Sequence, residues 1–214
     1  MKRLLSIPFF VLSLSVAPAQ EVVWLPSPDA KTLAMGGVAM TALSGSHPIY
    51  SNPAMAAFSL MPSQVSSSYY GQGKSNYYAV TGYWRFDNFN LTQIGWRQFF
   101  REHGGNDMAV DLGYSRRIGD RWAVGGVTRY MHFKRSEGSG DALAVDLSVG
   151  WMKPLNSVGD FSTLRVGAKL GNLGGYFQKS DYSLPISLTA GVALDTFLSD
   201  AHELTVGADF GYCF

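Results

Sequence analysis

Charged side chains recur at alternate positions along predicted β-strands, and these residues are the best placed to act together. Successive side chains of a strand point to opposite faces, so this spacing predicts that they share one face of a sheet, where opposite charges can pair across strands. The set is Arg85, Asp111, Arg129, Asp146, Arg165, Lys169 and Asp209. Two interpretations remain open: the charges anchor another part of the chain and shape a lumen, or they are solvated lumen charges without a specific task.

The sequence offers no catalytic arrangement around these charges. Gly73-Lys74-Ser75 resembles the end of a phosphate-binding loop, but the required earlier glycine is replaced by Ser68 and no helix is predicted to follow. There is no Gly-x-Ser-x-Gly elbow, and Asp181 and Asp195 have no evident acid–base partner. The histidines lack the spacing of metal ligands, and we expect surface or rim positions for them: His47, His103, His132 and His202. We therefore expect no enzymatic activity, no metal and no cofactor.

From residue 64 onward the side chains alternate with a period of two, which predicts β-strands. In 141–152, one face carries large apolar residues such as Leu143 and Leu147, and the other carries Ala144, Asp146 and Ser148. The same alternation occurs in 108–115, 164–171, 184–194 and 204–214. We expect about nine strands, the first at 64–70.

This alternation fits two architectures. A soluble sandwich turns its apolar face inward, whereas a membrane barrel turns it outward toward lipid. Gly, Ser, Thr and Ala dominate the opposite face, and aromatic residues gather at strand ends, as in the girdles of membrane barrels. These aromatics are Trp84, Phe86, Phe89, Trp122, Trp151, Phe161 and Phe197. We therefore predict an all-β fold, an antiparallel transmembrane β-barrel.

The predicted connections also alternate in kind. Short ones fall at 87–88, 119–121 and 198–201, with a longer one at 153–160, and Gly-rich polar ones fall at 71–76, 101–106, 135–140 and 174–183. Short periplasmic turns and longer outer loops would produce this pattern. Nine strands would leave Phe214 at the outer surface, although complete bacterial barrels have an even count. Either the chain lacks its final strands, or one strand is miscounted and the barrel is small and complete.

Composition limits the remaining classes. The 214 residues suffice for one domain, and Lys+Arg 17 against Asp+Glu 16 leaves no basic stripe for nucleic acid. With 24 glycines, 14% aromatic and 15% charged residues, the chain suits an all-β fold with many turns. Cys213 is the only cysteine, which excludes an internal disulfide and a cysteine-rich metal site.

Residues 1–19 have the features of a secretory signal peptide. A basic Lys2-Arg3 start precedes an apolar run at 4–16 that is too short to span a bilayer, and Ala17-Pro18-Ala19 supplies a small-x-small cleavage pattern. Cleavage near Ala19 predicts export, and the barrel prediction places the protein in the outer membrane of a Gram-negative bacterium. The expected organisation is a signal peptide at 1–19, an N-terminal plug or hatch at 20–63 and a barrel at 64–214.

The predicted plug contains two turn motifs. Gly36-Gly37 allows a positive φ or a close backbone approach, and Asn52-Pro53-Ala54 predicts an extended path followed by a turn. Residues 33–43 between them fit a short helix or an irregular hatch. An ordinary loop with common turn residues explains the same motifs equally well.

These motifs resemble a known family. The run Ala34-Met35-Gly36-Gly37-Val38-Ala39 followed by Tyr50-Ser51-Asn52-Pro53-Ala54 is similar to the start of FadL-like outer-membrane barrels, above all the PorV/PorQ branch associated with type IX secretion in the Bacteroidetes. Residues 170–174, 184–185 and 188–191 are similar to that branch's mid-barrel hairpin, and residues 142–150 are similar to the strand that precedes it. Members of the family are usually larger, with about fourteen strands, which agrees with a truncated FadL-like barrel.

The resemblance implies an outer-membrane protein that binds cargo or partners of type IX secretion. Loop aromatics are expected to form its contact surface, because loops on rigid scaffolds carry binding function: Tyr176, Phe177 and Tyr182. The alternative is a FadL-type transporter of lipophilic small molecules with apolar lumen residues at Tyr77, Tyr83, Val127 and Met131. A purely structural barrel is the third reading. Outer-membrane lipids are expected partners in each case, and nucleic acid is not.

Overall fold

The computed structural model describes residues 29–43, 46–102, 105–135, 138–155, 161–177, 184–199 and 202–214. The predicted signal peptide at 1–19 lies outside these ranges. Within them, nine strands form one antiparallel sheet in the order of the sequence, which confirms the expected strand number. The elements are α1 (Ala30–Ala34), the 3-10 helix η1 (Pro53–Phe58), β1 (Ser63–Gln72), β2 (Ser75–Arg85), β3 (Asn90–Phe100), β4 (Asn106–Ile118), β5 (Trp122–Arg135), β6 (Gly138–Leu155), β7 (Ser162–Tyr176), β8 (Ser187–Ser199) and β9 (His202–Cys213).

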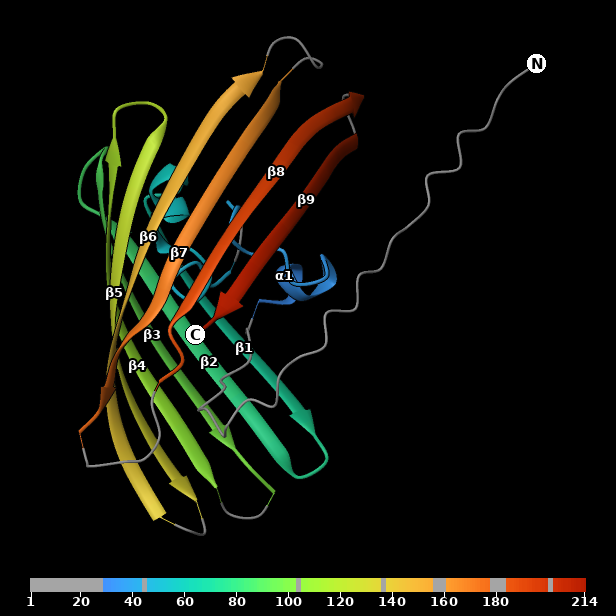
Figure 1. Ribbon diagram of the computed structural model, residues 1–214. Helices are drawn as coiled ribbons and strands as arrows, with labels where there is room; N and C mark the ends of the chain where they lie inside the picture. The colour runs from blue at the N-terminus through green and yellow to red at the C-terminus, as the bar shows by residue number, and fades with distance from the viewer. Residues whose placement is uncertain are drawn as a thin grey trace.

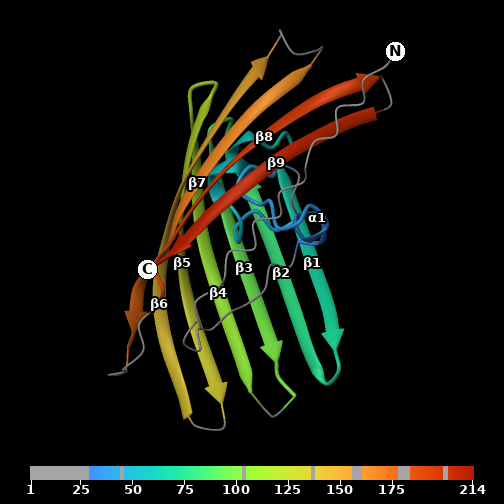
Figure 2. The ribbon, with the colours of Figure 1, turned by 45° about the vertical axis from the view of Figure 1, so that its right-hand side comes forward.

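The sheet curves strongly but does not close. Among the described residues, β1 and β9 each pair with one neighbour only. In a nine-strand meander the first and last strands run in the same direction, so they cannot complete an antiparallel barrel with each other. Residues 29–43 and 46–62 lie on the concave side, and α1 occupies the space between β9 and β1 (Figures 1 and 2).

The two faces of the sheet differ as the alternation predicts. The face toward the N-terminal part, here called the inner face, buries small and charged residues such as Ala144 and Asp146. The opposite, outer face leaves a large aliphatic side chain exposed in every strand: Val65, Val80, Ile94, Leu112, Val124, Leu147, Val166, Val192 and Val206. The interior of this fold is therefore polar and packed, while its outer surface is apolar.

Helix α1 is short and well capped. The Asp29 side chain accepts a hydrogen bond from the backbone N–H of Lys31 at 3.1 Å, and the helix stops where Gly36 (φ 71°) and Gly37 (φ 95°) take the left-handed conformation. Of the two possibilities that the sequence leaves open for the glycine pair, the structure shows the positive φ. The helix lies mainly before the expected range of 33–43, and most of that range is irregular. None of the helices in the described ranges is long and apolar enough to cross a membrane.

The expected alternation of short and long connections holds only in part. Pairing of β1 with β2 continues to Gln72 and Ser75, so Gly73-Lys74 is a tight hairpin turn, with Gly73 at φ 61°. Likewise β5 ends at Arg135 and β6 begins at Gly138, which pair with each other. Two of the four connections expected to be long are therefore two residues long, because the strands extend into them. A strand and not a helix follows Gly73-Lys74, as the sequence predicts.

Candidate functional site

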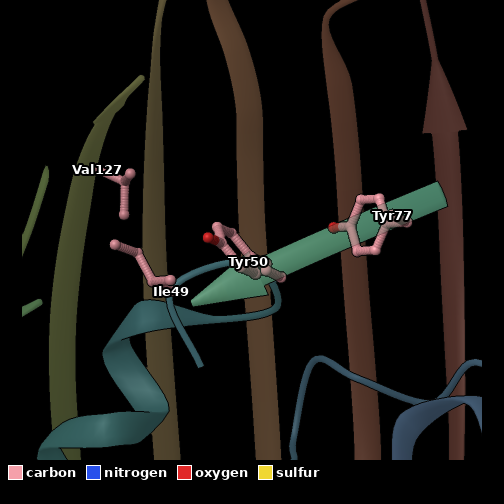
Figure 3. Packing of buried hydrophobic residues seen from close by; sticks show 5 residues of the cluster. Ile49, Tyr50, Tyr77 and Val127 are labelled. Atoms are coloured by element: carbon pink, nitrogen blue, oxygen red, sulfur yellow. The ribbon is translucent and has the colours of Figure 1, made fainter. Parts of the chain in front are cut away.

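The candidate site is the contact between the inner face and residues 29–43 and 46–62, here called the N-terminal segment. Helix η1 is buried against β3, β4, β5 and β6. Beside it, Ile49 and Tyr50 pack with Tyr77 of β2 and Val127 of β5 in one buried apolar cluster (Figure 3). Polar contacts surround this cluster, and they determine how the segment is held.

The Asn52-Pro53-Ala54 corner binds to three strands. The Asn52 side-chain oxygen accepts the N–H of Ala54 at 3.1 Å and so caps η1, while its amide nitrogen donates to the carbonyl oxygens of Met40 at 2.8 Å and Val149 at 3.2 Å. The carbonyl oxygen of Pro53 accepts from the Ser115 hydroxyl at 2.7 Å. Asparagine suits this position because one side chain both accepts and donates.

Two further contacts, to Pro53 and to Ala54, complete the corner. Gln93 of β3 donates to the Pro53 carbonyl oxygen at 3.1 Å, and Ala54 donates its N–H to the Ser148 hydroxyl at 3.1 Å. Gln93 also donates to the Ser115 hydroxyl at 2.9 Å. The corner therefore has defined partners on β3, β4 and β6, and is not an ordinary surface loop.

Asp209 of β9 binds the segment at a second point, about twelve residues before the Asn52 corner. One carboxylate oxygen accepts two successive backbone N–H groups, from Ala39 at 2.6 Å and Met40 at 2.8 Å. Charge-assisted bonds of this kind are stronger than neutral ones. They connect the N-terminal segment to an edge strand of the sheet.

Two of the predicted cations also contact the segment. Lys169 of β7 donates to the carbonyl oxygen of Tyr50 at 3.0 Å. Arg85 at the end of β2 donates to the carbonyl oxygens of Ala57, at 3.3 Å, and Ser59. Both cations therefore bind backbone oxygens that the segment's short helix and turns leave available.

Asp111, Arg129 and Asp146 form a buried network across β4, β5 and β6. The Arg129 guanidinium donates to Asp111 at 2.6 Å and to Asp146 at 3.0 Å. Arg97 of β3 lies 3.7 Å from Asp111 and stacks over the Tyr50 ring at 4.0 Å, which joins this network to the N-terminal segment.

A local irregularity positions Asp146. The pairing of β6 with β7 shifts register between Val145 and Leu147, and Asn172 opposite this point has φ 60°. The backbone N–H of Asn172 donates to Asp146 at 2.8 Å. Asparagine tolerates this conformation better than most residues, and the extra residue in β7 brings the Asn172 N–H within hydrogen-bond distance of the Asp146 carboxylate.

Arg165 belongs to the predicted set of inner-face charges, but its partner does not. It pairs with Asp195 of β8, which also accepts from the Thr205 hydroxyl at 2.9 Å. Asp195, for which the sequence offers no partner, is therefore part of a cross-strand ion pair. This pair links β7, β8 and β9 to one another.

Inner-face glycines make room for the N-terminal segment, a role not assigned to them from the sequence. A Cβ at Gly167 would overlap the Met40 carbonyl oxygen, and one at Gly150 would lie 2.6 Å from the Met55 sulfur. A Cβ at Gly95 would lie 2.6 Å from the Tyr50 hydroxyl oxygen. The alternation of side chains along the strands places these glycines on the inner face, and that is the only sign of their role in the sequence. It does not show which segment fills the space beside them.

His47 is buried, so the surface or rim position expected for it is wrong. Its Nδ1 and Nε2 each lie 2.8 Å from a hydroxyl oxygen, of Thr81 and Ser68 respectively. Thr81 donates its own hydrogen to the Ser46 carbonyl oxygen at 3.3 Å, which assigns the proton of neutral His47 to Nδ1. Burial lowers the pKa of His47; Asp29 opposes this shift and Arg97 adds to it.

The three aromatic residues predicted to form a contact surface do not share one environment. Tyr176 packs edge-on against Phe133, with ring centroids 5.4 Å apart, and joins the apolar cluster around Met131. Phe177, which follows it, is 64% exposed. Tyr182 lies outside the described residues.

The inner-face residues expected to line a transport path are largely covered by other parts of the chain. Tyr77 and Val127 are covered by Ile49 and Tyr50. Tyr83 packs against Ala56 and Leu91, its hydroxyl 2.8 Å from that of Ser59, and Met131 packs against Leu184. These side chains contact protein in the described structure.

This arrangement binds and positions a segment of chain. Across the described residues, no cluster of three or more His, Cys, Asp or Glu side chains is placed to hold a metal ion. Neither protein-family models nor curated protein sequences gave a match to the chain.

Proposed function

We propose that this protein is embedded in the outer membrane as a plugged β-barrel-type scaffold that serves protein secretion by binding cargo or secretion partners. The observation that carries the proposal is the polarity of the sheet: ion pairs and hydrogen bonds on the inner face, and bare aliphatic side chains on the outer face of every strand. Lipid is the solvent that favours such an inverted arrangement.

The outer face supports a membrane location. In water, a continuous apolar surface across nine strands would be an aggregation hazard. In a bilayer the same surface contacts acyl chains, and the free edges of β1 and β9 then require hydrogen-bond partners. An odd number of additional strands would join these two edges with antiparallel pairing throughout.

The N-terminal segment favours a binding role over an open channel. Asn52, Lys169 and Asp209 fix it across the inner face, so the space that a pore would use is filled. Binding then falls to the ends of the sheet, where Phe177 is exposed beside Tyr176. Because the motifs resemble those of the PorV/PorQ branch, we propose that this binding serves type IX secretion.

A crosslinking experiment in the native cell tests the proposal. A photo-crosslinking amino acid at Phe177 should yield adducts with secretion components or secreted cargo, identified by mass spectrometry, from a protein that fractionates with outer membranes. Phe86, which is similarly exposed at the opposite end of the sheet, is the matched control. A protein found in a soluble fraction, or the same adducts from both positions, would contradict the proposal.

A FadL-type transporter is the second candidate, because aromatic residues also line part of the inner face. Tyr70 stacks on Tyr77 with centroids 4.8 Å apart, and Phe99 continues the series at 6.3 Å. Tyr70 and Phe99 are only partly buried, and lipophilic ligands favour such surfaces. Uptake of a lipophilic tracer into liposomes that contain the protein would favour this function.

A further inference from the structure

The outer face is hollowed over β5, β6 and β7. A groove of about 290 Å³ lies there, with the directly paired Trp122, Trp151 and Val166 at one end and the directly paired Val149 and Ala168 at the other. Its floor is the backbone of Gly150 and Gly167, which are directly paired across β6 and β7. The side chains of these lining residues are apolar, and the volume is near the lower limit of small-ligand sites.

Two cations lie just beyond the tryptophan end of this groove. Trp122 begins β5 directly after Arg121, whose carbonyl oxygen accepts the N–H of Met152 at 2.9 Å, so Arg121 lies beside β6. Lys153 follows two residues after Trp151 on the same face, about 7 Å further along the strand. Both side chains are exposed, and together they exceed the single negative charge of Asp120 in the same turn.

We propose that this groove binds one anionic phospholipid, with an acyl chain over Gly150 and Gly167 and the phosphate beside Arg121 and Lys153. Tryptophan is enriched at the level of lipid headgroups, and basic residues at that level attract anionic lipids. Along the strands, the apolar groove is followed by the two tryptophans and then by the two cations. A phospholipid has the matching sequence of acyl chain, interfacial region and phosphate. The proposal rests on the proposed membrane location.

The tryptophans provide the readout. We would replace Trp24, Trp84 and Trp96 by Phe, so that Trp122 and Trp151 are the reporters. The protein is then reconstituted in vesicles that contain a low mole fraction of brominated phosphatidylglycerol or brominated phosphatidylcholine, because bromine quenches tryptophan fluorescence at contact. We expect stronger quenching by the anionic lipid, since each nearby cation is worth about a fivefold preference at low salt.

Two variants separate the headgroup from the chain. Arg121→Gln with Lys153→Gln should bring the two lipids to equal quenching, whereas Lys74→Gln, which removes an exposed cation from the β1–β2 turn, should leave the preference unchanged. Ala168→Phe fills the groove and should reduce quenching by the anionic lipid although both cations remain. If quenching is not reduced in this variant, the acyl chain does not lie in the groove.

The failure of this site is distinguishable from failure of the proposed function. Equal quenching by both lipids in the reporter protein, or a preference that survives the double substitution, refutes the site while leaving the membrane location intact. Absence of quenching by either lipid at a high mole fraction refutes the membrane location, and the lipid site with it.

Discussion

Asp111 and Asp146 are buried carboxylates beneath the N-terminal segment, and both pair with the guanidinium of Arg129. Removing Arg129 would leave both charges without their main partner, and breaking a buried pair in this way generally costs about 3–5 kcal/mol. The pairs therefore define which arrangement of the strands is tolerated, because few alternatives satisfy three buried charges together.

His47 makes this part of the protein sensitive to acid. Because its folded-state pKa is lowered, the unfolded chain takes up a proton first as pH falls below about 6.5, and stability decreases from there toward the folded pKa. Above that range His47 is neutral in both states and its contribution is fully present. We expect the N-terminal segment to become more susceptible to proteolysis as pH is lowered from 7.5 to about 5.5.

Two substitutions check this prediction by limited proteolysis across that pH range. His47→Gln keeps a donor and an acceptor but cannot titrate, so its profile should be flatter than that of the parent protein. His202→Gln changes an exposed histidine of β9 and should leave the profile unaltered. An unchanged acid response in His47→Gln would assign the response to other groups.

At the scale of elements, the inner-face glycines of the strands are as important as the segment they receive. The N-terminal segment approaches the backbone of β3, β6 and β7 so closely that Gly95, Gly150 and Gly167 cannot carry a side chain without displacement. The strands tolerate the lower β propensity of glycine because the segment packs into the space that results.

Gly167→Ala should therefore loosen the N-terminal segment and lower stability by about 1–3 kcal/mol, the usual cost of overpacking. Gly126→Ala is the matched control, because its Cβ would have nothing closer than 3.7 Å and would point to the outer face. Thermal unfolding in detergent and proteolysis of the segment measure both effects. If the two variants are equally stable, the close approach of Met40 to Gly167 does not affect the free energy of unfolding.

At the scale of the whole molecule, the proposed membrane location makes a prediction that a water-soluble sheet does not share. Leu147, in the middle of β6 on the outer face, is 52% exposed, and Leu60 in the N-terminal segment is 97% exposed. In water, arginine at either position is a surface substitution with a small effect. In a bilayer, Leu147→Arg should cost about 2–4 kcal/mol, because the charge then faces acyl chains.

Folding of the purified chain into vesicles, followed by flotation, compares the two variants. Leu147→Arg should insert less than the parent protein, while Leu60→Arg should behave like it. Equal insertion of both variants would place the outer face of β6 outside the hydrocarbon region.

The sequence by itself determined the nine strands, their antiparallel order and the two faces, since each depends on local alternation and turns. It also identified the glycine pair at 36–37 and the corner at 52–54, because backbone preferences of Gly, Asn and Pro act over a few residues. The family resemblance, the membrane and the secretion role remain predictions.

The tertiary structure decided the long-range pairings, which no local pattern encodes. It placed Asp209 on the N–H groups of Ala39 and Met40, some 170 residues earlier in the chain, paired Arg165 with Asp195, and buried His47. It also left β1 and β9 unpaired with each other in the described chain. Alternation fixes which face a residue occupies, but the curvature of the sheet and the path of the packed segment fix its neighbours, and both arise only when distant parts of the chain meet.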